Sequence, residues 1–369
     1  MSGLTKNLFK LIRRGKSGRN KGLSTGFPRL DKFTYGLQRS YFTVYGGDQG
    51  SGKSSLALYA SVFRPLMDYP KSNINILFYS FEMGAEVLLT KLLSLYLYEM
   101  YEKEISYETI LSLTKEVDDE TLELIRSAKD WLLSIEKKLT IIDKAVSADG
   151  LYATCKGWIS NFGEFIKEEE HKETFIAKDP EQYLIVIVDH IRLLRSGEGG
   201  IKVQIDKACD YLVYLRNKCG LTIGVVQQLN RAFKSMDRRT KGDGNYQMIQ
   251  LDDFADSSAP TQSAEVVIAI FHCFREKLKT CEGYNISELK DAIRILALIK
   301  NRFGQSDKSI GVNFFGACGV WRELPKAEEI KNYEDYKYLI KPNIIEKKDE
   351  LIEKDNYIKK DNENYFIII

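Results

Sequence analysis

The fold of this chain is decided by the stretch Gly47-Asp48-Gln49-Gly50-Ser51-Gly52-Lys53-Ser54. Its spacing, one glycine and then Gly-Lys-Ser after four residues, is that of a phosphate-binding loop. Backbone amides must turn inward around a triphosphate, and glycine allows the tight curl that this requires. A strand-like run, 41–45, precedes the loop and a helical stretch, 55–60, follows it, so the N-terminus of the helix faces the anion.

The loop predicts which residues bind ATP and a magnesium ion. Lys53 would reach the outer phosphates, and the Ser54 hydroxyl would hold the ion. The other residues expected to contact the nucleotide are Gly47, Gln49, Gly50, Ser51, Gly52 and Ser55.

Composition narrows the class of protein. With 369 residues, 44% of them hydrophobic and 29% charged, the chain is typical of soluble globular proteins that bury a sizeable core. No apolar run approaches the ~18 residues of a membrane span. The N-terminus does not resemble a signal peptide, and the six cysteines form no CxxC pair. We therefore expect a cytoplasmic protein with reduced thiols and no membrane partner.

The charge balance excludes a protein that coats nucleic acid through a global positive field. The net charge is only +2, from 54 basic and 52 acidic side chains. Contact with nucleic acid would have to come from local clusters, and basic residues gather in 10–21 and 231–241.

Apolar runs and helical stretches alternate along the chain, which predicts an α/β fold with a mostly parallel twisted sheet flanked by helices. The expected strands are 41–45, 75–80, 183–188, 221–226, 265–271 and 292–300, and the expected longer helices are 85–101 and 119–138. We expect three regions. Residues 1–22 form an amphipathic helix (5–14) and a basic connector, 23–325 form the compact body, and 326–369 form a charged tail with an apolar end.

Polar residues end three of the expected strands, where ligands bind in open α/β sheets. Asp189 follows 184–188 and is assigned to magnesium. Glu82 follows another strand and is placed to orient the attacking water, and Gln228 ends a third strand, where it could sense the γ-phosphate.

Here the chain resembles the RecA-like motor domain of DnaB-type replicative helicases. The matching segments occur in the family's order. They are Ser24–Asp31 with Thr34–Leu37, Ser80–Met83, Val188–His190 (with histidine after aspartate, as in phage members), Gln228–Arg231, Ala264–Val267 and Lys300–Gly304. The resemblance covers residues 23 to 324, and it implies a P-loop ATPase that acts as a DNA helicase.

The resemblance implies a ring of six copies around single-stranded DNA, with ATP bound between neighbours and 5′ to 3′ translocation. Lys300 and Arg302 would act on the nucleotide held by the adjacent copy. The residues expected to contact DNA are Arg231, Arg238, Arg239, Lys241, Asp256, Ser257 and Ser258. Many relatives have arginine where this chain has Ala255, so a direct side-chain contact at that position is not expected.

A second departure concerns the N-terminus, where the family carries a helical domain that meets primase. Here the resemblance covers only the family's linker helix, so contacts with primase and a helicase loader would lie elsewhere. The alternative function is a RecA-like ATPase that binds DNA in recombination or repair without unwinding it. A third interpretation, a non-catalytic assembly subunit, is disfavoured because Lys53, Glu82, Asp189 and Arg302 are all present.

Overall fold

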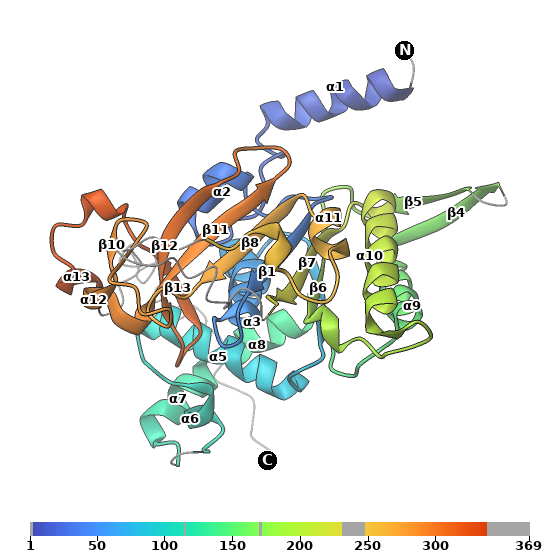
Figure 1. Ribbon diagram of the computed structural model, residues 1–369. Helices are drawn as coiled ribbons and strands as arrows, with labels where there is room; N and C mark the ends of the chain where they lie inside the picture. The colour runs from blue at the N-terminus through green and yellow to red at the C-terminus, as the bar shows by residue number, and fades with distance from the viewer. Residues whose placement is uncertain (1–2, 114–115, 170–171, 231–247, 338–369) are drawn as a thin grey trace, which may run out of the picture.

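A nine-stranded sheet forms the centre of the computed structural model, which describes residues 3–113, 116–169, 172–230 and 248–337 (Figure 1). The helices are α1 (Gly3–Lys16), α2 (Pro28–Thr34), α3 (Lys53–Leu58), α4 (Arg64–Asp68), α5 (Ala85–Tyr101), α6 (Tyr107–Ile110), α7 (Asp119–Ser127), α8 (Lys129–Glu136), α9 (Ala148–Ile159), α10 (Gly200–Cys219), α11 (Ala259–Ser263), α12 (Ile286–Leu289) and α13 (Glu334–Lys337). The strands are β1 (Phe42–Gly47), β2 (Ile74–Ser80), β3 (Leu139–Ile142), β4 (Gly163–Glu169), β5 (Lys172–Ala177), β6 (Tyr183–Asp189), β7 (Thr222–Gln228), β8 (Val266–Phe271), β9 (Thr280–Cys281), β10 (Tyr284–Asn285), β11 (Ile293–Asn301), β12 (Lys308–Phe315) and β13 (Val320–Glu323).

The sheet is parallel over most of its width and reverses at one side. Its order is β13-β12-β11-β8-β1-β7-β6-β2-β3, and all pairs from β8 to β3 are parallel. The predicted mostly parallel α/β sheet is confirmed. However, the run 292–300, expected within the parallel series, forms β11 and lies antiparallel to β8. The segment between these two strands contains the four-residue α12, a 3₁₀ turn (Lys290–Ala292) and the short β9–β10 pair, not the long helix that carries a chain back for a parallel pairing.

Two apolar cores cover the two faces of the sheet because successive side chains of a strand point to opposite sides. In β6, Leu184, Val186 and Val188 pack in the core that α9 and α10 complete. Ile185 and Ile187 of the same strand pack in the core that α3 and α5 complete. All seven residues of β6 are buried, which is why the strand reads as a continuous apolar run.

The helical predictions are confirmed in one case and corrected in another. The stretch 85–101 is α5. The stretch 119–138 forms two helices, α7 and α8, because the chain turns at Ala128. Ala128 is fully buried, and the turn brings Trp131 onto Tyr96 with 4.3 Å between the ring centroids. We attribute the end of α7 to this packing against side chains of α5, because the helical pattern in the sequence continues past Ala128.

Both ends of the described chain carry helices. The helix expected at 5–14 is α1, which extends away from the sheet in Figure 1. After Pro325, the side chains of Ile330, Tyr333 and Tyr336 pack against the core on the α10 side. The apolar end of the chain, 365–369, lies outside the described residues. None of the helices in the described part of the chain is long and apolar enough to cross a membrane.

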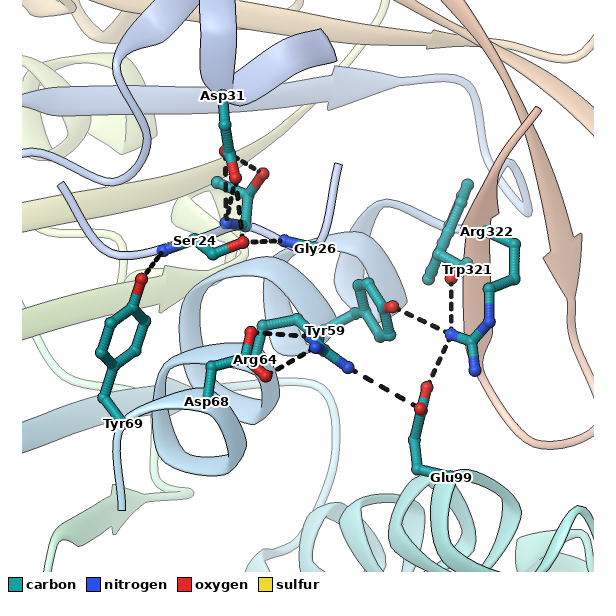
Figure 2. A network of polar contacts seen from close by, with 11 residues as sticks. Ser24, Gly26, Asp31, Tyr59, Arg64, Asp68, Tyr69, Glu99, Trp321 and Arg322 are labelled. Atoms are coloured by element: carbon teal, nitrogen blue, oxygen red, sulfur yellow. Dashed lines mark hydrogen bonds and ion pairs between the residues drawn. The ribbon is translucent and has the colours of Figure 1, made fainter. Parts of the chain in front are cut away.

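A buried ionic network joins α5 to β13 and to the helical segment that follows the phosphate loop (Figure 2). The Glu99 carboxylate, 4% exposed, lies 2.6 Å from Nη1 of Arg322 and 3.7 Å from Nη1 of Arg64. Arg322 also donates to the Tyr59 hydroxyl at 3.0 Å, and Arg64 pairs with Asp68 at 2.6 Å. The carboxylate at the centre therefore compensates two buried cations from two other elements.

We expect Glu99→Gln to lower the free energy of unfolding by roughly 3 kcal/mol, because it leaves two largely buried guanidinium groups without their shared anion. Denaturant titration would measure the change. The matched control is Glu120→Gln, since Glu120 makes an exposed ion pair with Lys103 and its loss should have no measurable effect. Equal stabilities of the two variants would contradict the assignment of Glu99 as a structural centre.

Candidate functional site

The phosphate loop (47–54) leaves the end of β1 and enters α3. Gly50 and Gly52 have φ angles of +70° and +101°, which residues with a Cβ rarely adopt. A Cβ on Gly52 would also lie 2.9 Å from Cζ2 of Trp321. The structure therefore requires glycine at these two positions, and the residue after Gly52 begins α3, whose N-terminus favours an anion.

Two cations lie on the phosphate loop. Lys53 Nζ donates to the Asp48 carbonyl oxygen at 2.7 Å. Arg275, which follows β8, donates from Nη1 to the carbonyl oxygen of Gln49, and the same atom lies 3.8 Å from Oδ2 of Asp48. Burial lowers the pKa of Lys53, and the nearby carboxylates of Asp48, Asp189 and Glu82 oppose this shift. The phosphate-loop motif identifies Lys53 from the sequence, whereas no local sequence pattern marks Arg275.

The carboxyl ends of four adjacent strands, β1, β7, β6 and β2, meet at one edge of the sheet. Gly47 is in register with Gln228, and Ser80 with Asp189. The sequence predicts this meeting of strand ends, and the parallel pairing produces it. The phosphate loop, Asp189, Gln228 and the turn that carries Glu82 thus lie along one edge.

Asp189 is the most buried acid of this edge, with 1% of its surface exposed. Its Oδ1 accepts a hydrogen bond from Ser54 Oγ at 2.9 Å, and Oδ2 is buried without a hydrogen-bond partner among the described residues. Burial raises the pKa of Asp189 to about 7, and Glu82 adds to the rise while Ser54 and Lys53 oppose it. A buried carboxylate that lacks a partner for one oxygen fits a divalent cation.

Ser54 and Asp189 are therefore the residues that could hold magnesium. No group of three or more His, Cys, Asp or Glu side chains in the described ranges could hold a metal ion by itself. Magnesium prefers few protein ligands together with phosphate oxygens and water, so a hydroxyl and one carboxylate beside a phosphate loop suit it.

Glu82 and Gln228 lie where the sequence places them. Glu82 is exposed in the turn after β2, and its charge acts on Lys53, Asp189 and His190. Gln228 ends β7 beside the phosphate loop, since the amide of the next residue donates to the Gly47 carbonyl at 3.2 Å. Both residues thus lie next to the region where an outer phosphate would bind.

Lys300 and Arg302 lie at the opposite edge of the sheet. Because β11 is antiparallel to β8, Lys300 is in register with Val267, at the start of β8. Arg302 Nη1 donates to Oε1 of Glu265 at 3.1 Å, and Lys300 Nζ donates to the carbonyl oxygens of Thr261 and Gln262 at 2.8 and 3.0 Å. Glu265 itself bonds the amide of Phe42, at the beginning of β1. The length of β1, about 17 Å for five residue steps, separates these cations from the phosphate loop of the same chain.

The segment 254–258 is tied to the end of β7. Gln227 Nε2 donates to the carbonyl oxygens of Ala255 and Ser257, both at 2.8 Å, and the Ala255 amide donates to the carbonyl oxygen of Gln228 at 2.9 Å. The sequence analysis chose Gln228 and missed Gln227, whose buried side chain makes this connection.

The residues expected to contact DNA are only partly described. Arg231, Arg238, Arg239 and Lys241 lie outside the described residues. Asp256 pairs with Arg192 at 3.3 Å. Ser257 is 6% exposed and its hydroxyl bonds Asp206, while the Ser258 hydroxyl accepts from Gln262 Nε2 at 3.0 Å. The two hydroxyls thus hold the segment in shape, and its one charged side chain, Asp256, is engaged by Arg192.

The strands β12 and β13 support the phosphate loop from behind, which the sequence analysis did not foresee. Trp321 is fully buried and stacks on Phe314 with 4.2 Å between ring centroids. Its Nε1 donates to Ser55 Oγ at 3.2 Å. Arg294 of β11 donates to the Ser51 carbonyl at 3.4 Å, and burial lowers its pKa to about 10. These side chains lie far from the loop in the chain, so no local pattern connects them with it.

Comparisons with known proteins agree on one family. The model of the DnaB-like helicase C-terminal domain matches residues 22–321. The replicative DNA helicase DnaB of Helicobacter pylori strain J99 is 26% identical over 291 residues, which are 78% of this chain and 51% of that protein. The chain spans about half the length of the curated relatives it matches.

Two solved structures share the fold. One is an ATPase domain, with a TM-score of 0.67 at 17% identity, over 88% of this chain and 100% of that one. The other is a DnaB-like replicative helicase, described with its interactions with primase, which has a TM-score of 0.64 at 18% identity, over 87% of this chain and 66% of that one. The RecA-like fold is thereby confirmed.

The raised pKa of Asp189 predicts a pH dependence of stability without metal and nucleotide. The unfolded chain ionises Asp189 near pH 3.8, whereas the folded carboxyl keeps its proton until about pH 7. Between these values the folded state binds more protons, so the stability of the wild type relative to Asp189→Asn should fall as the pH rises, by on the order of a few kcal/mol in total. Chemical unfolding in EDTA at pH 4 to 8 measures this difference.

Asp149→Asn is the matched control. Asp149 is exposed, and its hydrogen bonds with Lys207 and Tyr211 lower its pKa, so the corresponding difference should rise with pH only at the acid end of this range, near the unfolded value of 3.8, and then stay level up to pH 8. A difference between wild type and Asp189→Asn that does not depend on pH would contradict the protonation of buried Asp189.

Proposed function

This chain belongs to the family of DnaB-like helicase C-terminal domains, and from this premise we propose that it is the ATP-driven motor of a replicative DNA helicase. Six copies form a ring, translocate 5′ to 3′ on single-stranded DNA and unwind the duplex at a fork. One observation carries the proposal, namely that Lys53, Ser54 and Asp189 lie at one edge of the sheet while Lys300 and Arg302 lie at the other. A complete site for hydrolysis then requires two copies.

Within one copy, the phosphate-loop edge binds and orients the reactants. Lys53 exchanges its bond to the Asp48 carbonyl for the outer phosphates of ATP. Ser54 and Asp189 would hold magnesium, which would supply positive charge against the charge that develops on the phosphates. Glu82 orients the attacking water and accepts its proton, because it is the exposed carboxylate next to Asp189. Gln228 contacts the γ-phosphate and responds to its loss.

The neighbouring copy supplies positive charge. The Arg302 side chain is 48% exposed and is held by Glu265, which the buried Arg216 also binds. A guanidinium fixed in this way can point across a subunit boundary and stabilise the charge of the transition state. Lys300 lies beside it on β11 and adds a second cation.

The first helix supports assembly into a ring. Four large apolar side chains of α1 are about half exposed, namely Leu8 (55%), Phe9 (46%), Leu11 (55%) and Ile12 (55%). An amphipathic helix with an uncovered apolar face gains free energy when that face is buried. We assign α1 to packing on the adjacent copy. A primase and a helicase loader are proposed partners, because one solved relative is described together with its primase.

The end of β7 supports a link between ATP and DNA. Gln228 lies beside the phosphate loop, while Gln227 holds the segment 254–258, which would line the channel with its backbone amides. A shift of this strand end upon loss of the γ-phosphate would move the segment. Contacts of backbone amides with phosphates carry no base information, so the grip on DNA would be tolerant of sequence.

A forked DNA substrate tests the function. With ATP and magnesium, the wild type should release the displaced strand, and Lys53→Ala should abolish both hydrolysis and release because the outer phosphates lose their cation. Arg126→Ala is the control, since Arg126 is exposed on α7 and pairs only with Glu123 among the described residues. ATP hydrolysis stimulated by DNA without strand release would support the recombination ATPase instead.

Sharing of the site between copies predicts complementation. Arg302→Ala and Glu82→Ala should each bind ATP but hydrolyse it at least ~100-fold more slowly. Arg302→Ala lacks the cation that stabilises the transition state, and Glu82→Ala lacks the carboxylate that orients the water. In mixed rings, roughly a quarter of the interfaces would combine the intact half of each variant, so part of the activity should return. Mixtures that stay as inactive as the separate variants would refute a site shared between copies.

A further inference from the structure

We propose that Arg192, which lies just after the end of β6, contacts a phosphate group of the bound DNA. The neighbouring segment 254–258 has no cationic side chain of its own. The inference rests on the function proposed above and identifies which side chain grips the strand. Arg192 belongs to none of the segments by which the chain resembles its family, and its position becomes informative only from its contact with Asp256.

The segment that would face DNA is acidic by itself. Residues 251–258 contain Asp252, Asp253 and Asp256 and no lysine or arginine. Asp206 of α10 adds a further carboxylate, which accepts the Ser257 hydroxyl. Asp253 is buried and bonds the amide of Gln250, but Asp252 is exposed and Asp256 lies at the surface of the segment. A phosphate approaching these carboxylates would be repelled unless a cation lies among them.

Arg192 is the cation that the described structure places there. Its Nη1 lies 3.3 Å from Oδ1 of Asp256, and its side chain remains 54% exposed. Asp256 adopts a left-handed backbone, with φ of +68°. Among the described residues no other acid pairs with Arg192. A guanidinium has five N–H donors, so one contact with Asp256 leaves a donor edge for two phosphate oxygens.

The base of Arg192 is fixed. It lies in a 3₁₀ turn, Ile191–Leu193, whose first residue is 1% exposed and packs in the core on the α10 side. The turn begins two residues after Asp189, the carboxylate assigned to magnesium. The segment 254–258 is fixed in turn by Gln227 and Asp206. Two fixed elements therefore present one charged pair: the turn that follows β6, and the segment 254–258, which is hydrogen-bonded to the end of β7.

Two roles of Arg192 must be separated. One is direct contact with phosphate, and the other is only to hold Asp256 and so shape the segment. Asp256→Asn distinguishes them because it removes the ion pair but keeps Arg192. Direct contact predicts that Asp256→Asn binds DNA as tightly as the wild type or more tightly, since one repulsive carboxylate is gone. A purely structural role predicts that Asp256→Asn loses affinity as Arg192→Ala does.

The experiment measures binding of the full chain to a fluorescent oligothymidylate, with a non-hydrolysable ATP analogue and magnesium, at several salt concentrations. We expect Arg192→Ala to weaken binding by roughly tenfold or more and to reduce the slope of log affinity against log salt by roughly 0.7 for each copy that contacts a phosphate. Arg192→Lys should keep most of the salt slope and lose part of the affinity. Arg126→Ala is the control for charge removed elsewhere, and equal unfolding midpoints exclude misfolding.

The outcomes separate this inference from the proposed function. If the wild type binds the oligonucleotide and Arg192→Ala binds with the same affinity and salt slope, the inference is wrong and the helicase proposal stands. If Asp256→Asn reproduces the loss, Arg192 is a positioning residue and the direct contact is refuted. If the wild type itself does not bind single strands under these conditions, the proposed function fails and the inference fails with it.

Discussion

The reversal of strand direction at β11 is the constraint on which the rest of this structure depends. Parallel strands bring their carboxyl ends to one edge of a sheet, so the phosphate loop, Asp189 and Gln228 meet there. The antiparallel β11 ends at the other edge, where Glu265 holds Arg302. Since β1 runs between these two edges over about 17 Å, the two groups of residues cannot meet in one chain. Under the proposed function, assembly would be a condition of chemistry, because the missing charge would come from the next copy.

The same antiparallel extension also supports the phosphate loop. The strands β12 and β13 continue from β11 and bring Phe314 and Trp321 behind Gly52 and Ser55. Arg322, next to Trp321, enters the ionic network with Glu99 and Tyr59, which fixes the helical segment after the loop (Figure 2). One end of the extension thus carries the cations proposed to act on a neighbour, and its other strands hold the nucleotide-binding loop of their own chain. If these cations act on a neighbour as proposed, a displacement at that contact would reach the loop through packed side chains.

Two central strands connect the candidate nucleotide site with the surface assigned to DNA. β7 ends in Gln227, which bonds the segment 254–258, and in Gln228, which lies beside Gly47. β6 ends in Asp189, and the turn after it carries Arg192 to Asp256. At each strand end, the residue assigned to the nucleotide and the residue that contacts the segment are at most three positions apart: Gln228 and Gln227, and Asp189 and Arg192. Such short, buried connections can transmit small movements because packed strand ends have little freedom to relax.

The sequence by itself determined the features that local chemistry requires: the phosphate loop, the buried apolar strands, and the acids and amide at their ends. The spacing of residues in the sequence identifies Gly50, Gly52, Lys53 and Asp189. This is possible because a few neighbouring residues determine the curvature of the loop and the position of a strand end. Only the tertiary structure decided the direction of β11, the break of the helix at Ala128, the support by Trp321, and the contacts of Gln227 and Arg275. Most of these features depend on packing and hydrogen bonds between segments that lie far apart in the chain. The break at Ala128 depends on side chains of one helix that pack against another helix. Contacts of both kinds leave no periodic or local pattern in the sequence.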